Sequence, residues 1–311
     1  MKKHTVRRLV PVLFSALVLS ACTRGGDSSA DFAAQTTSFT ASDEDFPVID
    51  VHLHPHFDGV PEEITGIMQT KAELSGQMKR AKVVAGVLME HEGEDPYKDA
   101  TELNSIVCAG VRDKVNAAAI EKGLKEGHYG CIKIYIGYVW RYAYDPVYEP
   151  AYKLAEKYDV PVVFHTGDTY STTGKLKYAD PLTIDEVAVD HPNVRFVIAH
   201  LGNPWIQSAA EVAYKNPNVW AEASALMIGN MDKVEPEVAA TYLIRPIRWA
   251  FGYMENTEKL MFGTDWPLND IAAYKRAYMR AIPRESWKAV FHDNALKVFP
   301  RLKPLVEGKK G

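Results

Sequence analysis

Beyond its first 21 residues, the sequence lacks any run rich in lysine and arginine, and no stretch there interleaves aromatic with basic residues. The chain has 36 Lys and Arg residues against 40 Asp and Glu residues, a formal net charge of −4. Proteins that bind nucleic acid concentrate positive charge on one face or along one segment. We therefore expect no nucleic acid among the partners of this protein.

Cysteine is also scarce, with three residues in the whole chain. One of them, Cys22, follows an N-terminal apolar segment, which leaves Cys108 and Cys131 in the folded part. Export from the cytoplasm makes a disulfide permissible. However, Cys131 opens an apolar strand, where cysteine commonly acts as a small buried hydrophobe. We expect two buried thiols, with a bridge between them as the alternative.

The N-terminal apolar run Leu9–Leu19 is too short to cross a bilayer as a helix. It follows four basic residues and ends in Leu19-Ser20-Ala21-Cys22, which resembles the lipobox of bacterial lipoproteins. The resemblance implies that residues 1–21 are removed and that Cys22 is lipidated, which would anchor the protein to a membrane. An ordinary secretory signal is the alternative. We expect an exported lipoprotein on the periplasmic or cell-surface side.

The composition divides the remaining chain into two parts. Residues 22–46 are rich in Ser, Thr, Ala, Gly and Asp without apolar periodicity, which predicts a flexible tether. Residues 47–311 contain no second linker and are long enough for one large core. Without residues 1–21, the chain keeps 32 Lys and Arg residues against 40 acidic ones. We therefore expect one acidic domain over residues 47–311.

Short apolar runs alternate with longer amphipathic segments in this domain. The expected strands are 48–53, 82–89, 130–136, 160–165, 194–200, 218–223 and 259–264, with a weaker one near 114–120. Helical patterns cover 146–158, 205–215 and 237–251, and further helices are expected to start at Pro61 and near Asp180. Strands that are apolar on both faces are typical of parallel sheets. Eight such strands with following helices predict an α/β fold of the (β/α)₈ TIM-barrel type. A doubly wound sheet would normally carry a glycine-rich turn after its first strand, and none is present.

Polar side chains stand at the expected carboxyl ends of the strands. In Asp50-Val51-His52-Leu53-His54, strand alternation predicts that the aspartate and both histidines share one face. Three more polar residues follow directly on apolar runs: His165, His200 and Asp265. Barrel enzymes have their active sites at this end, and burying so many titratable groups is costly unless a cation organises them. The pattern predicts a metal site.

These segments together resemble the amidohydrolase superfamily, and within it the amidohydrolase-related (amidohydrolase 2) branch, over residues 48–299. The matching segments are Asp50-Val51-His52-Leu53-His54, Ile132-Lys133-Ile134, Val163-Phe164-His165-Thr166-Gly167, Ile198-Ala199-His200-Leu201-Gly202, Phe262-Gly263-Thr264-Asp265-Trp266-Pro267 and Asn294-Ala295. The resemblance implies a metal-dependent hydrolase with four ligands and one adjacent acid/base group. The implied ligands are His52, His54, His165 and Asp265, and the implied acid/base group is His200. Imidazoles with one carboxylate suit zinc or a similar ion.

Lys133 leaves the number of metal ions open. Its position matches the lysine that is carboxylated and bridges two metals in binuclear members of the superfamily. His165 and His200 would then bind the second ion. In the amidohydrolase-related branch, a lysine at this site is often found without a second metal, as an ion-pairing or substrate-contacting group. We expect one zinc ion per chain, and we expect Lys133, His200 and Asp265 to act in catalysis.

The expected reaction is hydrolysis of a lactone, amide or ester-like bond in a small molecule. A metal lowers the pKa of its bound water, Asp265 takes the proton, and the metal and His200 stabilise the oxyanion. The first alternative is a metal-dependent decarboxylase of an aromatic or enoic acid. The second is a lipoprotein that binds without catalysis, against which the complete ligand set argues. The sequence leaves open whether the protein forms a homo-oligomer.

Overall fold

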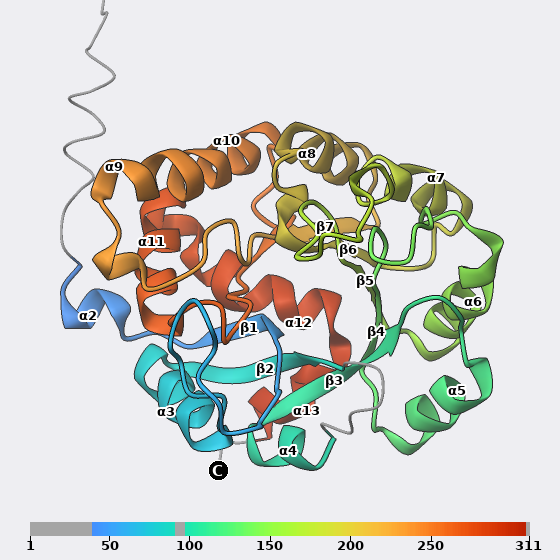
Figure 1. Ribbon diagram of the computed structural model, residues 1–311, viewed down its shortest axis with the longest axis horizontal. Helices are drawn as coiled ribbons and strands as arrows, with labels where there is room; N and C mark the ends of the chain where they lie inside the picture. Colours follow the sequence, from blue (N-terminus) through green and yellow to red (C-terminus); the bar gives the residue numbers. More distant parts are fainter. Residues whose placement is uncertain (1–38, 91–96, 309–311) are drawn as a thin grey trace, which may run out of the picture. The chain divides into compact units, whose positions relative to one another are not determined.

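The computed structural model describes residues 39–90 and 97–308. The expected signal peptide, Cys22 and tether residues up to 38 lie outside these described residues. Within them, eight parallel strands pair in the order of the sequence, from β1 to β8, and helices surround the sheet (Figure 1). This is the (β/α)₈ barrel that the sequence predicts. No described helix is long and apolar enough to span a membrane.

Each strand is followed by one principal helix. The strands are β1 (Val48–Leu53), β2 (Val83–Met89), β3 (Ser105–Val111), β4 (Cys131–Ile134), β5 (Val162–Phe164), β6 (Phe196–Ile198), β7 (Val219–Glu222) and β8 (Leu260–Met261). The principal helices are α3 (Lys71–Ala81), α4 (Tyr97–Glu102), α5 (Ala117–Glu126), α6 (Glu149–Tyr158), α7 (Thr183–Asp190), α8 (Ile206–Lys215), α10 (Arg245–Tyr253) and α11 (Ile271–Ala281). Shorter helices are α2 (Ala41–Glu44), α9 (Pro236–Ala239), α12 (Asn294–Val298) and α13 (Lys303–Glu307).

Backbone hydrogen bonds between β1 and the segment that follows β8 close the barrel. The Val51 N–H donates to the Phe262 carbonyl at 3.0 Å, and the His54 N–H donates to the Trp266 carbonyl at 2.9 Å. Between them, the Asp265 N–H donates to the His52 carbonyl at 2.9 Å. Closure therefore places the carboxyl ends of β1 and β8, with their polar residues, side by side.

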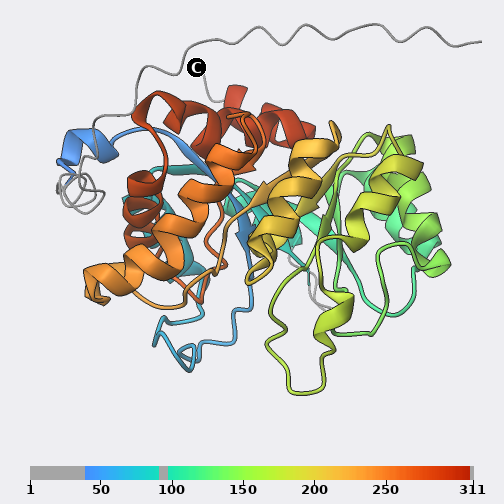
Figure 2. The same ribbon diagram turned by 90° about the horizontal axis from the view of Figure 1, so that it is seen from above.

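The barrel interior is apolar at its amino end and polar at its carboxyl end. Phe299 and Leu302 pack with interior strand residues such as Val51 and Val163, so the C-terminal segment covers the amino end. The long loops 54–70 and 165–182, which follow β1 and β5, project together from the other end (Figure 2). These loops therefore border an active site at the carboxyl ends of the strands.

The third strand lies upstream of its predicted position. Residues 105–111 form β3, whereas most of the expected strand 114–120 precedes or opens α5. The Asn116 side chain accepts a hydrogen bond from the Ala119 N–H, and the alanines that follow favour a helix. The helix expected at Pro61 is also absent. The chain there is irregular, and α3 begins only after Thr70, whose hydroxyl accepts from the Glu73 N–H.

The prediction of two free thiols is wrong, because Cys108 and Cys131 form a disulfide. The two residues are directly paired on neighbouring strands, Cys108 on β3 and Cys131 on β4, with their Cα atoms 4.3 Å apart. Because the third strand was predicted at 114–120, the sequence did not place Cys108 next to Cys131. Both cysteines are fully buried inside the barrel.

The folded part begins earlier than the predicted boundary at residue 47. Helix α2 is capped by Thr40, and the ring of Phe39 meets the edge of Trp287 at a centroid distance of 5.5 Å. The ring of Phe46 stacks on that of Trp287 at a centroid distance of 5.6 Å. Residues 39–46 are therefore part of the packed domain and not of a tether.

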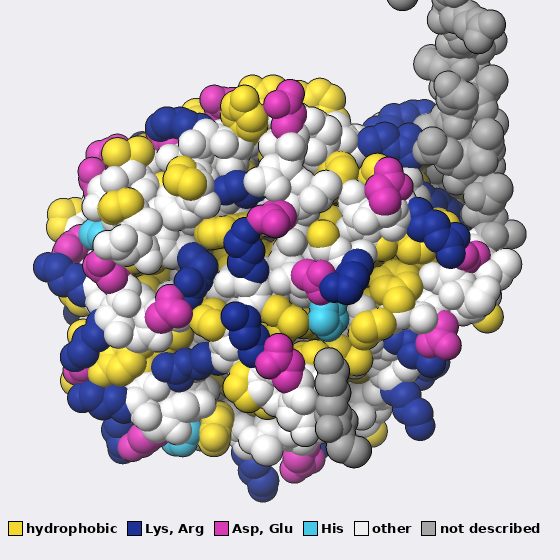
Figure 3. Space-filling model, turned by 180° about the vertical axis from the view of Figure 1, so that it is seen from behind, with side chains coloured by type: hydrophobic (Ala, Val, Ile, Leu, Met, Phe, Trp, Pro, Cys, Tyr) yellow, Lys and Arg dark blue, Asp and Glu magenta, His cyan; other side chains and the backbone are white. Residues whose placement is uncertain are grey.

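The face opposite to that of Figure 1 carries Lys, Arg, Asp and Glu side chains interspersed with apolar ones (Figure 3). Charged side chains of both signs are spread over this face.

Candidate metal centre

A cluster of ligand-capable side chains lies where β1 and β8 meet. The Asp265 Oδ1 atom is 3.0 Å from His54 Nε2 and 3.5 Å from His52 Nε2. His52 is fully buried and Asp265 is 6% exposed. The ligand atoms of these three residues all lie within 4.8 Å of one another. The structure thus brings together three of the four predicted ligands.

The simple alternation predicted for β1 fails at Asp50, because the pairing with β2 shifts register after this residue. Val51 packs in the barrel interior, and the Asp50 carboxylate turns to the backbone N–H of His52 at 3.1 Å and the Thr264 hydroxyl at 2.6 Å. Burial raises the pKa of Asp50 to about 7, against the effect of these hydrogen bonds. Asp50 therefore ties β1 to the segment after β8 and does not join the histidines.

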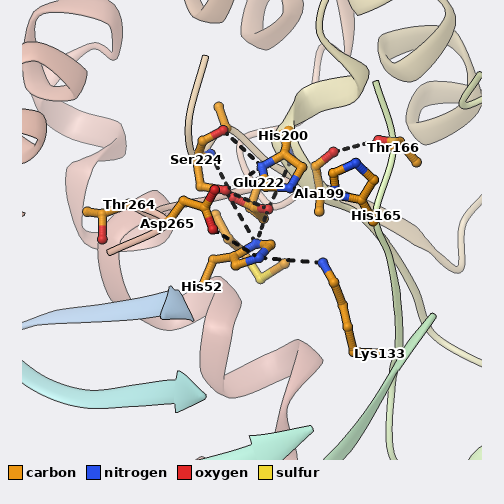
Figure 4. A network of polar contacts seen from close by, with 12 residues as sticks. His52, Lys133, His165, Thr166, Ala199, His200, Glu222, Ser224, Thr264 and Asp265 are labelled. Carbon is orange, nitrogen blue, oxygen red and sulfur yellow. Dashed lines mark hydrogen bonds and ion pairs between the residues drawn. The ribbon is translucent and has the colours of Figure 1, made fainter. Parts of the chain in front are cut away.

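Glu222, at the end of β7, orients the cluster and is absent from the predicted site. Its Oε1 accepts from His52 Nδ1 at 2.8 Å, from the His200 backbone N–H at 3.0 Å and from the Ser224 hydroxyl at 3.1 Å (Figure 4). Its Oε2 accepts from the Ser224 backbone N–H at 2.7 Å. Because Nδ1 of His52 carries the proton donated to Glu222, the lone pair of Nε2 points toward Asp265. A carboxylate behind an imidazole fixes both its tautomer and its orientation as a ligand.

His165 and His200 form a second pair beside this cluster. The His165 Nε2 donates to the Asp168 carbonyl at 2.8 Å, and the His200 Nδ1 donates to the Ser224 carbonyl at 3.2 Å and lies 2.9 Å from the Ser224 hydroxyl. The two remaining nitrogens, His165 Nδ1 and His200 Nε2, face each other at 3.2 Å. Burial holds the pKa of His165 well below its usual range and lowers that of His200 to about 4. Two lone pairs therefore converge on the same point.

Lys133 approaches the cluster from β4. Its Nζ lies 3.5 Å from His52 Nε2 and 5.5 Å from the centre of the Tyr135 ring. The side chain is fully buried, and burial lowers the pKa of Lys133 to about 8 against the attraction of Glu222 and Asp265. This places an amine of reduced proton affinity beside the candidate ligands.

The residues at this edge fit a divalent cation. The Oδ1 atom of Asp265 is buried and has no well-aligned hydrogen bond. Burial alone would raise the pKa of Asp265, but the charge interaction with His52 and the contact with His54 hold this pKa well below its usual range. The facing nitrogens of His165 and His200, Nδ1 and Nε2, lie 3.2 Å apart beside these atoms. The donor set of imidazoles and one carboxylate suits zinc and similar ions.

Among the described residues, a second group of ligand-capable atoms comprises His52, His200 and Glu222. The oxygens of Glu222 already accept hydrogen bonds from four donors, so this carboxylate serves as support for the imidazoles. His165 belongs to neither group and lies at the edge of the cluster, next to His200.

A cavity of about 540 Å³ opens above the cluster. Its lining includes the candidate metal residues His54, His165, His200 and Asp265. Its other walls come from the loops, with Tyr138 and Tyr170 on one side and Pro267 and Leu268 on another. The size suits a small molecule.

Two residues at the carboxyl ends of strands hold their backbone in the left-handed region. The φ angle is 58° at His200 and 63° at Asp265. Non-glycine residues adopt this conformation at a cost of about 1–3 kcal/mol each when the surroundings impose it. At both positions the unusual turn aims a polar side chain into the site.

The sequence model of the amidohydrolase family, Amidohydro_2, matches residues 49–301. The chain belongs to the amidohydrolase family. Because the match spans the barrel from β1 to the C-terminal helices, it covers every residue of the cluster. Amidohydrolases are enzymes, and the residues gathered here support a divalent metal in this amidohydrolase. No curated protein matches the chain.

Solved structures of similar fold include both hydrolases and decarboxylases. A probable 2-pyrone-4,6-dicarboxylic acid hydrolase from Acinetobacter baumannii has a TM-score of 0.60 and 15% identity, covering 82% of this chain and 100% of that one. A 5-carboxyvanillate decarboxylase from Novosphingobium aromaticivorans, complexed with manganese, has a TM-score of 0.58 and 14% identity, covering 84% and 98%. A zinc-bound amidohydrolase from Burkholderia multivorans has a TM-score of 0.60 and 14% identity, covering 82% and 99%. At these identities the likeness shows the shared fold.

Proposed function

We propose that this amidohydrolase hydrolyses a lactone, amide or ester-like bond in a small molecule with one zinc ion. The proposed ligands are His52, His54, His165 and Asp265. The observation that carries the proposal is the buried Asp265 Oδ1, which faces two imidazole nitrogens at the floor of a cavity of about 540 Å³. A metal bound there polarises a carbonyl oxygen and lowers the pKa of a water molecule.

The side chains of the chain supply the proton transfers of this reaction. Asp265 is held ionised by its histidine neighbours, so its carboxylate can accept the proton of the attacking water. His200, held by Ser224, presents the lone pair of Nε2 to the cavity, where it can take up a proton and pass it to the leaving group. The buried amine of Lys133 stabilises negative charge that develops beside His52.

Decarboxylation of an aromatic acid is the second candidate. The ring of Tyr138 lies 4.7 Å from that of His165, and both residues line the cavity. An aromatic wall next to the proposed ligands suits a planar substrate. The manganese-bound 5-carboxyvanillate decarboxylase shares the fold. In this reaction a protonated side chain would deliver a proton to carbon.

Metal content and isotope incorporation test these proposals together. We expect about one zinc ion per wild-type chain, with His52→Ala losing the ion and more than about 100-fold in kcat/KM. The control His128→Ala alters a partly exposed histidine that does not line the cavity, and it should keep both the ion and the activity. With lactones, amides and esters in ¹⁸O-labelled water, hydrolysis places the label in the product.

Three outcomes contradict particular parts of the proposal. Release of carbon dioxide from aromatic acids without uptake of label favours decarboxylation. Two ions per chain with added mass on Lys133 contradict a single metal. Full activity in a chelator-treated protein that holds no metal contradicts the metal-dependent reaction altogether.

We also propose that the protein is an exported lipoprotein anchored through Cys22. The Cys108–Cys131 disulfide supports export, because such bonds persist mainly in oxidising compartments. Expressed in a bacterium, the wild-type chain is expected in the membrane fraction with a lipid-sized mass increase on its N-terminal peptide. Cys22→Ala is expected to lose both properties. Unchanged membrane association of this variant would exclude the anchor.

A further inference from the structure

Large apolar side chains are exposed on the two loops that follow β4 and β5. These side chains are between 43% and 62% exposed, and we call them the rim patch: Trp140, Tyr144, Tyr170, Leu176 and Leu182. Both loops belong to the carboxyl end of the barrel, and the loop after β5 projects far from it (Figure 2). Clustered apolar side chains that remain exposed mark a surface of interaction.

Hydrogen bonds between the two loops make the rim patch one continuous surface. The Trp140 ring N–H donates to the Thr173 carbonyl at 2.8 Å, and the Ala143 backbone N–H donates to the Thr183 hydroxyl at 2.8 Å. At its inner edge the patch reaches the candidate site, because Tyr170 also lines the cavity above the metal centre. The patch and the mouth of the cavity therefore face the same way.

The loop after β5 is locally basic in a chain that is acidic as a whole. Residues 169–179 contain Lys175 and Lys177 and no acidic residue. Asp168 and Asp180 flank this segment. Asp168 lines the cavity, and the Asp180 carboxylate accepts a hydrogen bond from a backbone N–H two residues further on at 3.0 Å. The charge that accompanies the apolar tip of the loop is therefore positive.

Lysines and aromatic rings lie together in this surface. The Nζ atom of Lys175 lies 3.7 Å from the centre of the Trp140 ring, and that of Lys177 lies 4.8 Å from the centre of the Tyr178 ring. Tryptophan, tyrosine and lysine next to leucine are typical of segments that lie at a bilayer surface. Interfaces between proteins are instead depleted in lysine. The composition favours a membrane over a protein partner.

The proposed anchor brings a membrane within reach of this surface. Residues 22–38 can span at most about 60 Å when fully extended, so the anchor keeps the barrel close to the bilayer. A tether of this length raises the effective concentration of the barrel at the lipid surface and does not decide which face meets it. A weak contact between the folded domain and the bilayer is then sufficient to orient the domain.

We propose that the rim patch binds the surface of a bilayer that contains anionic lipids and turns the mouth of the barrel toward it. The two lysines contact the headgroups, while Tyr170, Leu176 and Leu182 insert at the boundary between headgroups and acyl chains. The cavity then opens beside the membrane, where amphiphilic small molecules collect. This inference rests on the proposed export and anchor for the presence of the membrane, and not on the reaction at the metal.

A fluorophore at the tip of the loop tests this orientation. Thr172→Cys is exposed, and Cys108 and Cys131 are bridged, so an environment-sensitive thiol label reacts with the introduced cysteine. The processed full-length protein is reconstituted into vesicles of phosphatidylglycerol and phosphatidylethanolamine. We expect the emission to rise and shift to shorter wavelength, and quencher-labelled lipids to reduce it. The same label at Lys303→Cys, in α13 at the opposite end of the barrel, should respond to neither.

Apolar side chains of the patch should contribute to this binding. Leu176→Ser/Leu182→Ser should lower the ratio of docked to undocked protein, measured by the label at residue 172, by about 10-fold or more. The matched control Val189→Ser/Val238→Ser removes two apolar side chains that are similarly exposed on α7 and α9, and it should leave the ratio unchanged.

The lysines should make the binding depend on lipid charge. Lys175→Gln/Lys177→Gln should lower the docked ratio by about 10- to 30-fold on these vesicles, and high salt should weaken the docking of wild type. Vesicles of phosphatidylcholine alone should bind the patch less well. The control Lys122→Gln/Lys125→Gln removes two exposed lysines of α5 and should keep the docked ratio.

Three results would overturn the proposal. In the first, the label at residue 172 stays in water and is not quenched by lipid in wild type. In the second, the control pairs reduce docking as much as the patch variants do. In the third, emission grows with the number of proteins per vesicle without quenching by lipid, which assigns the patch to contact with a second copy of this chain.

The design separates this inference from the proposed anchor and reaction. A lipidated protein that hydrolyses its substrate while the label at residue 172 stays in water contradicts the membrane contact alone. A protein without lipid that sediments with anionic vesicles, and loses this property in Leu176→Ser/Leu182→Ser, upholds the membrane contact and contradicts the anchor.

Discussion

At the level of single residues, Glu222 connects the parts of the metal centre. Its carboxylate accepts hydrogen bonds from the His52 ring, the His200 backbone, and the backbone and hydroxyl of Ser224. The sequence contained a signal for this residue, because Glu222 lies one residue before the end of the apolar strand predicted at 218–223. His165, His200 and Asp265 were found by that same signal at other strands.

Replacing Glu222 by glutamine should therefore disturb the ligands without changing the shape of the side chain. An amide N–H₂ would face a neighbouring donor whichever way it turns. We expect Glu222→Gln to lower zinc affinity by about 10- to 100-fold, measured by competition with a chelator. Glu186→Gln, on the exposed side of α7, is the matched control. Unaltered zinc affinity would contradict a role of Glu222 in orienting the ligands.

Because of Lys133, the free energy of unfolding of the metal-free protein should change with pH in the alkaline range. Burial lowers its pKa from 10.5 to about 8. Below pH 8 both the folded and the unfolded chain hold the proton, whereas between pH 8 and 10.5 only the unfolded chain does. Unfolding then takes up a proton, so the folded state gains stability as pH rises through this window.

The measurement compares wild type with Lys133→Met by urea unfolding in the presence of chelator. The free energy of unfolding of wild type, relative to the variant, should rise by up to about 1.4 kcal/mol per pH unit between pH 8 and 10.5. Lys153→Met removes an exposed lysine and corrects for general effects of charge. A difference that stays flat over this window would contradict the lowered pKa.

At the level of elements, the misplaced third strand explains the wrong prediction of two free thiols. Residues 105–111 mix small and β-branched residues and include Gly110, whose close approach to the Glu90 backbone leaves no room for a Cβ atom. A strand with so few bulky side chains gives a weak hydrophobic signal. Placing the strand at 114–120 separated Cys108 from Cys131. The register between neighbouring strands, which is a tertiary property, brings the two cysteines together.

The disulfide between β3 and β4 should stabilise the barrel measurably. It closes a loop with a sequence separation of 23 residues. We expect the double variant Cys108→Ala/Cys131→Ala to lose about 2–4 kcal/mol of unfolding free energy. Wild type unfolded under reducing conditions should approach the variant, and thiol titration of the denatured, unreduced protein should detect neither cysteine. Equal stability of oxidised wild type and the variant would contradict a stabilising bond.

At the level of the whole molecule, the alternation of strands and helices was sufficient to predict the barrel. Patterns that are apolar on both faces reflect burial on both sides of a parallel sheet, and this information is local in sequence. The contact of β1 with β8 follows from closure, so the meeting of His52 with Asp265 could be expected. Packing of Phe39 and Phe46 on Trp287 joins opposite ends of the chain and has no local signature.

The positive φ angles at His200 and Asp265 place backbone strain within the candidate site. The strained backbone lies at two residues that have roles in the proposed reaction, so substitutions that relieve the strain would alter these roles. Selection of variants for thermal stability alone would therefore favour more stable barrels that have lost activity.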